Sequence, residues 1–362
     1  MIPLFYPETK YWKECTDAVA SVLQTRWWGE AYKVEEFENT FSDNFNYQFC
    51  LAVNSGSAAL ELAYHLIDIQ AGDEVITPVL TCSATNLPLI RRNAKIVFAD
   101  ITKDTLLIDP EDVSKKITKN TKAIIAVTLG GLPIDKAIFS IAKEHNIPVV
   151  VDAAQSLGVS EEYGDYIIYS FQAIKHFSTG DGGMLVLNNN EDYLRAKKLR
   201  WFGIDREAKK QSGWQAYKDR QMTINIEEAG YKYHMNDIAA VLGLVGLKYS
   251  DDILDYRKYL TKIYNENLKN CTIIAGGACW LYGVLINNRD FVAEQLLDKG
   301  IDVNMVHLRN DIYKVFSDKK DDLLNMDWVE KRYLYLPLNT HITEKQVKAV
   351  IVTFNEIVES FG

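Results

Sequence analysis

Short runs of consecutive hydrophobic residues alternate with helix-patterned segments between Phe49 and Leu187. Such runs, without a polar residue at every second position, are typical of strands buried on both faces of a parallel sheet. The predicted strands are Phe49–Val53, Glu74–Pro78, Lys95–Asp100, Thr121–Val127, Ile147–Asp152, Tyr166–Phe171 and Gly183–Leu187. Between them, hydrophobic residues recur three and four apart, most clearly over 57–67 and 134–145. The pattern predicts an α/β fold with a mostly parallel central sheet.

The rest of the chain divides into a lead-in, a polar excursion and a second unit. Residues 1–30 resemble an amphipathic lead-in, and the polar stretch Arg206–Tyr231 predicts a long excursion of the kind that often carries function. After an apolar helix over 236–247, the predicted elements are helices at 253–268, 291–299 and 344–360 and short strands at 271–274 and 280–286. We therefore predict a large α/β domain over 1–249 and a smaller α+β domain over 250–362.

Composition narrows the class of protein. The 362 residues are 48% hydrophobic and 25% charged, which excludes a disordered or low-complexity chain. A net charge of −9 argues against nucleic acid or an anionic membrane surface as the main partner. The five cysteines are scattered without a CxxC pair, so we expect free thiols in a reducing compartment and no metal site. With no signal-peptide pattern and no membrane-length hydrophobic run, we predict a cytoplasmic protein.

Candidate chemistry lies where the predicted strands end, because parallel α/β sheets bind ligands at the carboxyl ends of their strands. Asn54-Ser55-Gly56-Ser57 separates a strand from a helix. Glycine permits a close backbone approach there, and the amides of a helix N-terminus bind phosphate. An ordinary helix cap would use the same residues. The segment Val79–Asn86, rich in small and hydroxylated residues, suits either the wall of a flat ligand's pocket or a capped helix start.

An acid and a lysine complete this set of strand-end residues. Asp152 follows a hydrophobic strand, and burial of an unpaired carboxylate costs on the order of several kcal/mol. It therefore favours a cationic partner such as a protonated ring nitrogen. A helix N-cap, or a structural pair with a Lys or Arg, would explain the residue equally well. Lys175 follows the next strand. Partial desolvation would lower its pKa and make it a nucleophile, whereas a solvated surface lysine would have no such role.

At these residues the sequence resembles the sugar aminotransferases of the DegT/StrS type, which are pyridoxal phosphate (PLP) enzymes of aspartate-aminotransferase-like fold, known as fold type I. The resemblance covers nearly the whole chain. Its motifs are Trp28-Gly29, Phe37-Glu38, Asn54-Ser55-Gly56-Ser57-Ala58-Ala59-Leu60, Gly72-Asp73-Glu74-Val75-Ile76-Thr77-Pro78, Asp152-Ala153-Ala154-Gln155, Ser170-Phe171 with Lys175, Gly182-Gly183, Gly230-Tyr231-Lys232-Tyr233-His234-Met235 and Leu336-Pro337-Leu338.

The resemblance implies roles for individual residues. Lys175 corresponds to the Schiff-base lysine and Asp152 to the partner of the pyridine nitrogen. The implied cofactor contacts are Ser55, Gly56, Ser57, Cys82, Asp152, Gln155, Ser170, Gln172, Lys175 and Lys232. Among these, Cys82 stands where the family commonly stacks an aromatic ring, and Gln172 is at a variable position. Lys232 stands where the family usually has an Asn that reaches the phosphate of the other subunit, which implies a homodimer with shared active sites.

The implied reaction moves an amino group from glutamate to a nucleotide-linked keto sugar, a 4-keto-6-deoxyhexose, for the synthesis of amino sugars in O-antigens or other glycans. Amination at C3 and an unactivated sugar acceptor stay open. Candidate substrate contacts are Trp28, His307 and Arg309, although packing for Trp28 and a surface pair for the other two are equally simple explanations.

Three other classes of function are less favoured. A dinucleotide-binding oxidoreductase needs a GxGxxG run after its first strand, and the sequence has none. In the related sugar dehydratases a His replaces the Schiff-base lysine, whereas this chain has Lys175 followed by His176. A non-catalytic cofactor-binding sensor would not need both Lys175 and Asp152.

Overall fold

The computed structural model describes residues 1–158, 164–211, 226–316 and 319–360. Its central sheet has seven strands in the order β1-β7-β6-β5-β4-β2-β3. The strands are β1 (Phe49–Val53), β2 (Glu74–Pro78), β3 (Lys95–Ala99), β4 (Thr121–Val127), β5 (Val149–Asp152), β6 (Tyr166–Ser170) and β7 (Gly183–Leu187). Strand β7 runs antiparallel to both of its neighbours, while the pairs from β6 to β3 are parallel. The predicted mostly parallel α/β sheet is confirmed.

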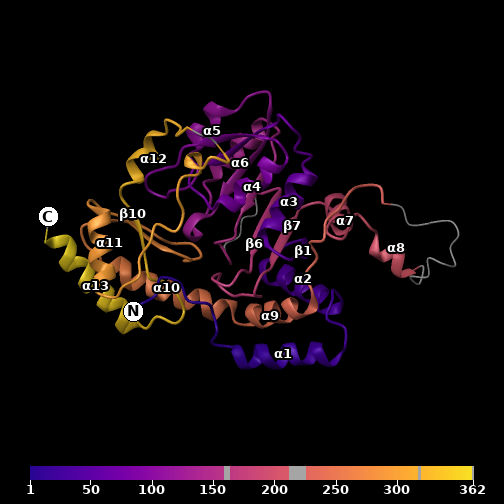
Figure 1. The fold of residues 1–362 in the computed structure, drawn as a ribbon, viewed down its shortest axis with the longest axis horizontal. Helices are drawn as coiled ribbons and strands as arrows, with labels where there is room; N and C mark the ends of the chain where they lie inside the picture. The colour runs from indigo at the N-terminus through magenta and orange to yellow at the C-terminus, as the bar shows by residue number, and fades with distance from the viewer. Residues whose placement is uncertain (159–163, 212–225, 317–318, 361–362) are drawn as a thin grey trace.

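Helices cover both faces of this sheet (Figure 1). Side chains along β1 alternate between two hydrophobic clusters: Cys50 and Ala52 join one, and Leu51 and Val53 the other. The helices of the large unit are α1 (Trp12–Gln24), α2 (Tyr32–Phe45), α3 (Gly56–Leu66), α4 (Ser83–Arg91), α5 (Pro110–Lys116), α6 (Lys136–Glu144), α7 (Asn190–Leu199), α8 (Arg206–Gln211) and α9 (Asp237–Lys248). Helices α3, α4 and α7 contribute to one cluster and α2, α5, α6 and α9 to the other. Burial on both faces explains why the strands are hydrophobic without alternation.

A second, antiparallel sheet has the order β10-β9-β8. Its strands are β8 (Thr272–Ile274), β9 (Tyr282–Leu285) and β10 (Tyr333–Leu336), and the accompanying helices are α10 (Ser250–Asn267), α11 (Arg289–Asp298), α12 (Leu324–Val329) and α13 (Glu344–Glu359). Helices α10, α11 and α13 pack with this sheet in a third hydrophobic cluster. Strand β10 was absent from the sequence prediction. A division of the chain at 249/250 stays a prediction.

The first residues of the chain lie against the C-terminal part. Ile2 forms a parallel bridge with Ile301, and the Leu4 N–H donates to the Asp302 carboxylate over 3.1 Å. Helix α1 runs beside α9 (Figure 1). The lead-in thus contributes both to the second unit and to the surface of the first.

The polar excursion begins with α8, and residues 212–225 lie outside the described residues. None of the helices in the described parts of the chain has the length and hydrophobicity needed to cross a lipid bilayer.

Candidate active site

A cavity of about 570 Å³ opens at the carboxyl ends of β1, β2, β5 and β6. It brings together most of the predicted site residues. Those lining it are Ser55, Gly56, Ser57, Cys82, Asp152, Gln155, Ser170, Gln172, Lys175 and His307. Trp28, Lys232 and Arg309 are not among its lining residues. The strand-end argument therefore located the cavity, because parallel strands place their carboxyl ends on one edge of the sheet.

One end of the cavity is the N-terminus of α3. Ser55 caps this helix, its side-chain oxygen accepting the Ala58 N–H over 3.1 Å. A Cβ at Gly56 would lie 3.1 Å from the Ser170 Cβ, so glycine allows β6 and the start of α3 to approach closely. A helix N-terminus favours anions through its unpaired N–H groups and its dipole. This end can therefore hold a phosphate group without a cationic side chain.

Asp152 also lines the cavity, at the end of β5, and is only 6% exposed. Its Oδ2 accepts the Thr85 hydroxyl over 2.8 Å, and its Oδ1 accepts the Ala154 N–H over 3.1 Å. Burial raises the pKa of this carboxyl, while these hydrogen bonds and nearby Lys175 act in the opposite direction. Within the described residues it forms no ion pair. The environment suits a ligand that brings its own cationic N–H.

Lys175 is partly buried and lines the same cavity. Its Nζ lies 4.3 Å from the centroid of the Trp280 ring, and the Trp280 indole N–H donates to the Ile174 carbonyl over 3.1 Å. Burial lowers the pKa of Lys175 to about 8, although Asp152 and Cys82 partly oppose the shift. An amine with this pKa is available as a nucleophile and as a base near neutral pH.

Gln155 and His307 meet across the cavity from distant parts of the chain. The Gly130 N–H donates to Gln155 Oε1 over 2.7 Å, which identifies the other amide atom as the donor toward His307 Nε2, 3.0 Å away. His307 must then be neutral, with its proton on Nδ1. Burial, together with Lys175, lowers the pKa of His307 to about 4. The His307 carbonyl also accepts the Tyr333 hydroxyl over 2.7 Å. Hydrogen bonds therefore hold both the side chain and the backbone of His307.

Three smaller groups line the cavity between these residues. Ser170 Oγ accepts the Gln172 N–H over 3.4 Å, and Gln172 Oε1 accepts the Ile174 N–H over 3.1 Å. Both side chains therefore shape the turn that leads to Lys175. Cys82 is the N-cap residue of α4 and is partly buried. A thiol at this place fills space but offers no ring face for stacking.

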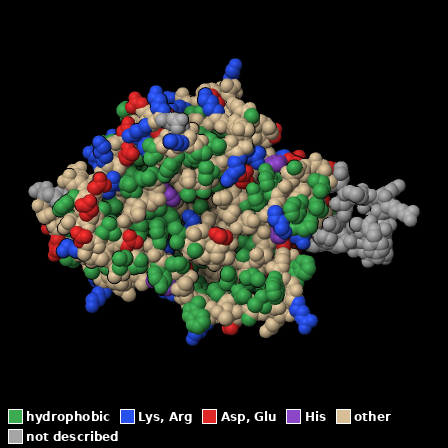
Figure 2. Space-filling view, viewed as in Figure 1, with side chains coloured by type: hydrophobic (Ala, Val, Ile, Leu, Met, Phe, Trp, Pro, Cys, Tyr) green, Lys and Arg blue, Asp and Glu red, His purple; other side chains and the backbone are tan. Residues whose placement is uncertain are grey.

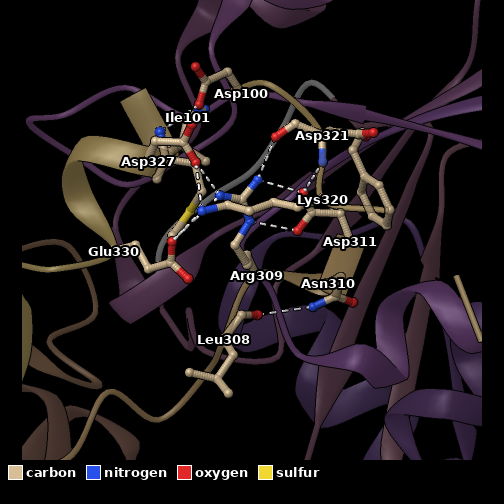
Figure 3. Close-up of polar contacts among 12 residues, drawn as sticks. Asp100, Ile101, Leu308, Arg309, Asn310, Asp311, Lys320, Asp321, Asp327 and Glu330 are labelled. Atoms are coloured by element: carbon tan, nitrogen blue, oxygen red, sulfur yellow. Dashed lines mark hydrogen bonds and ion pairs between the residues drawn. The ribbon is translucent and has the colours of Figure 1, made fainter. Parts of the chain in front are cut away.

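Arg309 does not reach the cavity, contrary to its predicted contact with substrate. Its side chain is 0% exposed and lies in a cluster of acidic residues (Figure 3). Nε and Nη2 donate to the two carboxylate oxygens of Asp311 over 2.7 and 2.5 Å, and Nη1 pairs with Asp327 and Glu330. Burial disfavours the charged form of the Arg309 guanidinium, but the neighbouring carboxylates stabilise that form more strongly and raise the pKa of Arg309. Its donors are taken, so a substrate phosphate has no free N–H to meet.

Trp28 and Lys232 also lie outside this cavity. Trp28 is 55% exposed and its indole N–H donates to the Leu23 carbonyl over 3.3 Å. Lys232 Nζ lies 5.5 Å from the centroid of the Phe202 ring, and its carbonyl accepts from the Asn54 side chain over 3.1 Å. Neither side chain contributes to the cavity of its own chain.

Sequence reasoning missed several residues that the fold brings to the cavity. Leu4, Phe5 and Asn304 line it, and Thr85 and Trp280 contact the acid and the lysine. The hydroxylated run Val79–Asn86 was a signal for Thr85, although it did not single that residue out. Nothing in the local sequence of Trp280 pointed to Lys175, which lies in a different unit of the fold.

Comparison with known proteins assigns the class. The pattern of the DegT/DnrJ/EryC1/StrS aminotransferase family matches residues 10–355. The chain therefore belongs to this family. Its members are PLP-dependent, and the fold is that of PLP-dependent aminotransferases of the aspartate-aminotransferase-like type.

Individual relatives agree with this assignment. Uncharacterized protein MJ1066 of Methanocaldococcus jannaschii is 33% identical over 372 residues, covering 96% of this chain and 95% of the relative. The spore coat polysaccharide biosynthesis protein SpsC of Bacillus subtilis is 32% identical over 374 residues, with the same coverage. Among solved structures, the sugar aminotransferase CalS13 of Micromonospora echinospora superposes with a TM-score of 0.89 at 26% identity, over 98% of this chain and 100% of that one.

Proposed function

We propose that this aminotransferase moves an amino group from glutamate to a nucleotide-linked keto sugar, with a 4-keto-6-deoxyhexose as the preferred acceptor. The observation that carries the proposal is the single cavity in which Lys175, Asp152 and the N-terminus of α3 meet. A phosphate site, an unpaired buried acid and a lysine with a lowered pKa match the three groups that PLP presents to a protein. The sugar as acceptor is supported by CalS13, whose name identifies it as a sugar aminotransferase.

Each residue of the chain has a defined task in this proposal. Bound PLP supplies an electron sink that stabilises a negative charge at the donor's α-carbon. The start of α3 and Ser170 would hold the phosphate, and Asp152 would keep the ring nitrogen protonated. Gln155, whose amide nitrogen has a second N–H besides the one directed at His307, would lie near the ring hydroxyl. Lys175 would hold the aldehyde carbon of the cofactor, and its free amine would serve as the base that accepts and returns the proton of the donor's α-carbon.

A second subunit is part of the proposal. We expect a homodimer in which Lys232 faces the phosphate of the neighbouring site. Figure 2 shows hydrophobic side chains gathered on the part of this face that lies over α1 and α9. Trp12 and Leu23 of α1, and Trp27 and Trp28 just after it, are exposed. Patches of this kind typically mark protein–protein contacts. Lys232 lies outside the cavity of its own chain, which suits a role across the interface.

The proposed setting is cytoplasmic synthesis of an amino sugar for a surface glycan. SpsC supports it, because its name places that relative in the biosynthesis of a coat polysaccharide. Amination at C3 and an unactivated keto sugar are the alternatives that the substrate test below separates.

The test is a panel of nucleotide-linked and free keto sugars, incubated with glutamate and purified protein carrying PLP, with 2-oxoglutarate as the readout. We expect turnover with a nucleotide-linked 4-keto sugar and loss of at least about 1,000-fold in rate in Lys175→Ala. Lys115→Ala, at a lysine whose side chain is 72% exposed, is the matched control and should behave as wild type. Turnover by Lys175→Ala at the wild-type rate, or by free sugars alone, would contradict the proposal.

A further inference from the structure

We propose that Thr85 is a positioning residue that keeps Asp152 charged and aimed into the cavity, through the hydrogen bond from its hydroxyl to the carboxylate. The inference rests on the proposed role of Asp152 at the ring nitrogen. Thr85 is completely buried in the first turn of α4, and its Oγ1 lies 2.8 Å from Asp152 Oδ2. Residues 85 and 152 come from different strand ends, so the tertiary fold alone creates this contact.

The direction of the hydrogen bonds follows from the chemistry of the groups. An ionised carboxylate has no proton to give, so the Thr85 hydroxyl must donate to Asp152. Its oxygen is then free to accept from Thr81, whose hydroxyl oxygen lies 3.1 Å away. Thr81 lines the cavity. The two hydroxyls and the carboxylate form a chain in which each bond polarises and strengthens the next.

This chain acts on the charge state of Asp152. Burial raises the pKa of that carboxyl, whereas the bond from Thr85 favours the ionised form. Without the hydroxyl, Asp152 would lose the donor on Oδ2 and keep the Ala154 N–H on Oδ1. A neutral acid would no longer hold the proton on a ring nitrogen, and a carboxylate with one free oxygen would be free to rotate.

The surroundings of Thr85 hold it in this place. Its carbonyl accepts the buried Tyr64 hydroxyl over 2.9 Å. The neighbouring Asn86 side chain accepts the Thr77 hydroxyl over 2.8 Å and donates to Asn310 Oδ1 over 3.0 Å. The start of α4 is therefore tied to the sheet on one side and to a segment of the C-terminal half on the other. A hydroxyl fixed in this way does not need to reorganise when a ligand arrives.

The test compares three substitutions in the full-length protein. Thr85→Val removes the hydroxyl and keeps the shape, while Thr85→Ser keeps the hydroxyl. The control is Thr340→Val, because Thr340 is also a buried threonine (4% exposed) whose hydroxyl donates to a carboxylate, that of Glu8. Neither Thr340 nor Glu8 lines the cavity. The readouts are the dissociation constant of PLP, from titration of its visible absorption band, the rate of the glutamate half-reaction, and the unfolding temperature.

We expect Thr85→Val to weaken PLP binding and slow the half-reaction by about 10- to 100-fold, the range for losing a hydrogen bond to a charged group. Thr85→Ser should recover most of both. Thr340→Val should lower the unfolding temperature and leave both constants unchanged. In an Asp152→Asn background, Thr85→Val should have no further effect on PLP binding, because the acceptor charge is already gone.

Two results would overturn the inference. One is PLP affinity and half-reaction rate in Thr85→Val that match those of Thr340→Val, which would make Thr85 a purely structural residue. The other is a full additional loss in the Asp152→Asn background. Since none of these measurements uses a sugar, failure of the proposed acceptor leaves this test intact.

Discussion

Replacing Arg309 by Met should destabilise the protein strongly while leaving the affinity for substrates unchanged. Arg309 and Asp311 have side chains that are 0% exposed and share two hydrogen bonds. Removing the guanidinium would leave the Asp311 carboxylate with the Asp321 N–H, at 2.9 Å, as its remaining hydrogen-bond donor within the described residues. Breaking a buried ion pair on one side typically costs about 3–5 kcal/mol. The pairs with Asp327 and Glu330 add little, since those carboxylates are 37% and 33% exposed.

The assay is urea unfolding at pH 7, at one fixed protein concentration because dimerisation would add to stability. Arg91→Met is the control: Arg91 also pairs with a carboxylate, but its side chain is 64% exposed, so we expect a loss of about 0–1 kcal/mol. Combining Arg309→Met with Asp311→Leu should recover part of the loss, because no unpaired charge stays buried. An Arg309→Met protein of normal stability with a tenfold higher KM for the sugar would refute this reasoning and restore Arg309 as a substrate contact.

Two further predictions test the packing and the protonation states. His307 should lower the free energy of unfolding as the pH drops from about 6.5 to about 4. Its pKa in the folded protein is lowered to about 4, so the unfolded chain binds the proton at a higher pH than the folded chain does. Over this range the free energy of unfolding should fall by about 1.4 kcal/mol per pH unit. In His307→Asn the free energy of unfolding should depend less on pH between about 6.5 and about 4. The same pH dependence in the variant and the wild type would contradict this prediction. Gly246→Ala would place a Cβ 2.4 Å from the Phe177 ring and should cost about 1–3 kcal/mol in thermal unfolding. The control Gly29→Ala meets only an ordinary 3.6 Å contact, and equal losses in both would argue against the packing explanation.

The segment from His307 to Asp311 links the two sheets at the cavity. Asn310 Nδ2 donates to the Thr81 carbonyl over 2.7 Å, and its N–H donates to the Val79 carbonyl over the same distance. At one end His307 accepts from Gln155, and at the other Arg309 is buried in its acidic cluster. A residue that was expected to bind substrate thus anchors the segment that places residues around the cavity.

The sequence by itself determined the central sheet and the position of the candidate site. Strand segments that are buried on both faces are hydrophobic without alternation, so β1, β4 and β7 could be read directly with their observed bounds. Because ligands bind where parallel strands end, the same reasoning selected Asp152 and Lys175. These features depend on residues that are neighbours in the chain, and such patterns survive in a linear sequence.

Only the tertiary structure decided which side chains touch. Thr85 reaches Asp152, the Trp280 ring covers Lys175, and Arg309 turns away from the cavity into a buried acidic cluster. Each of these outcomes depends on how a helix or loop packs against an element far away in the chain. The residues next to a Thr, Trp or Arg in the sequence do not reveal whether its side chain points into a cavity or into a core. Their roles follow from the hydrogen bonds and charges that packing places within about 3 Å of them.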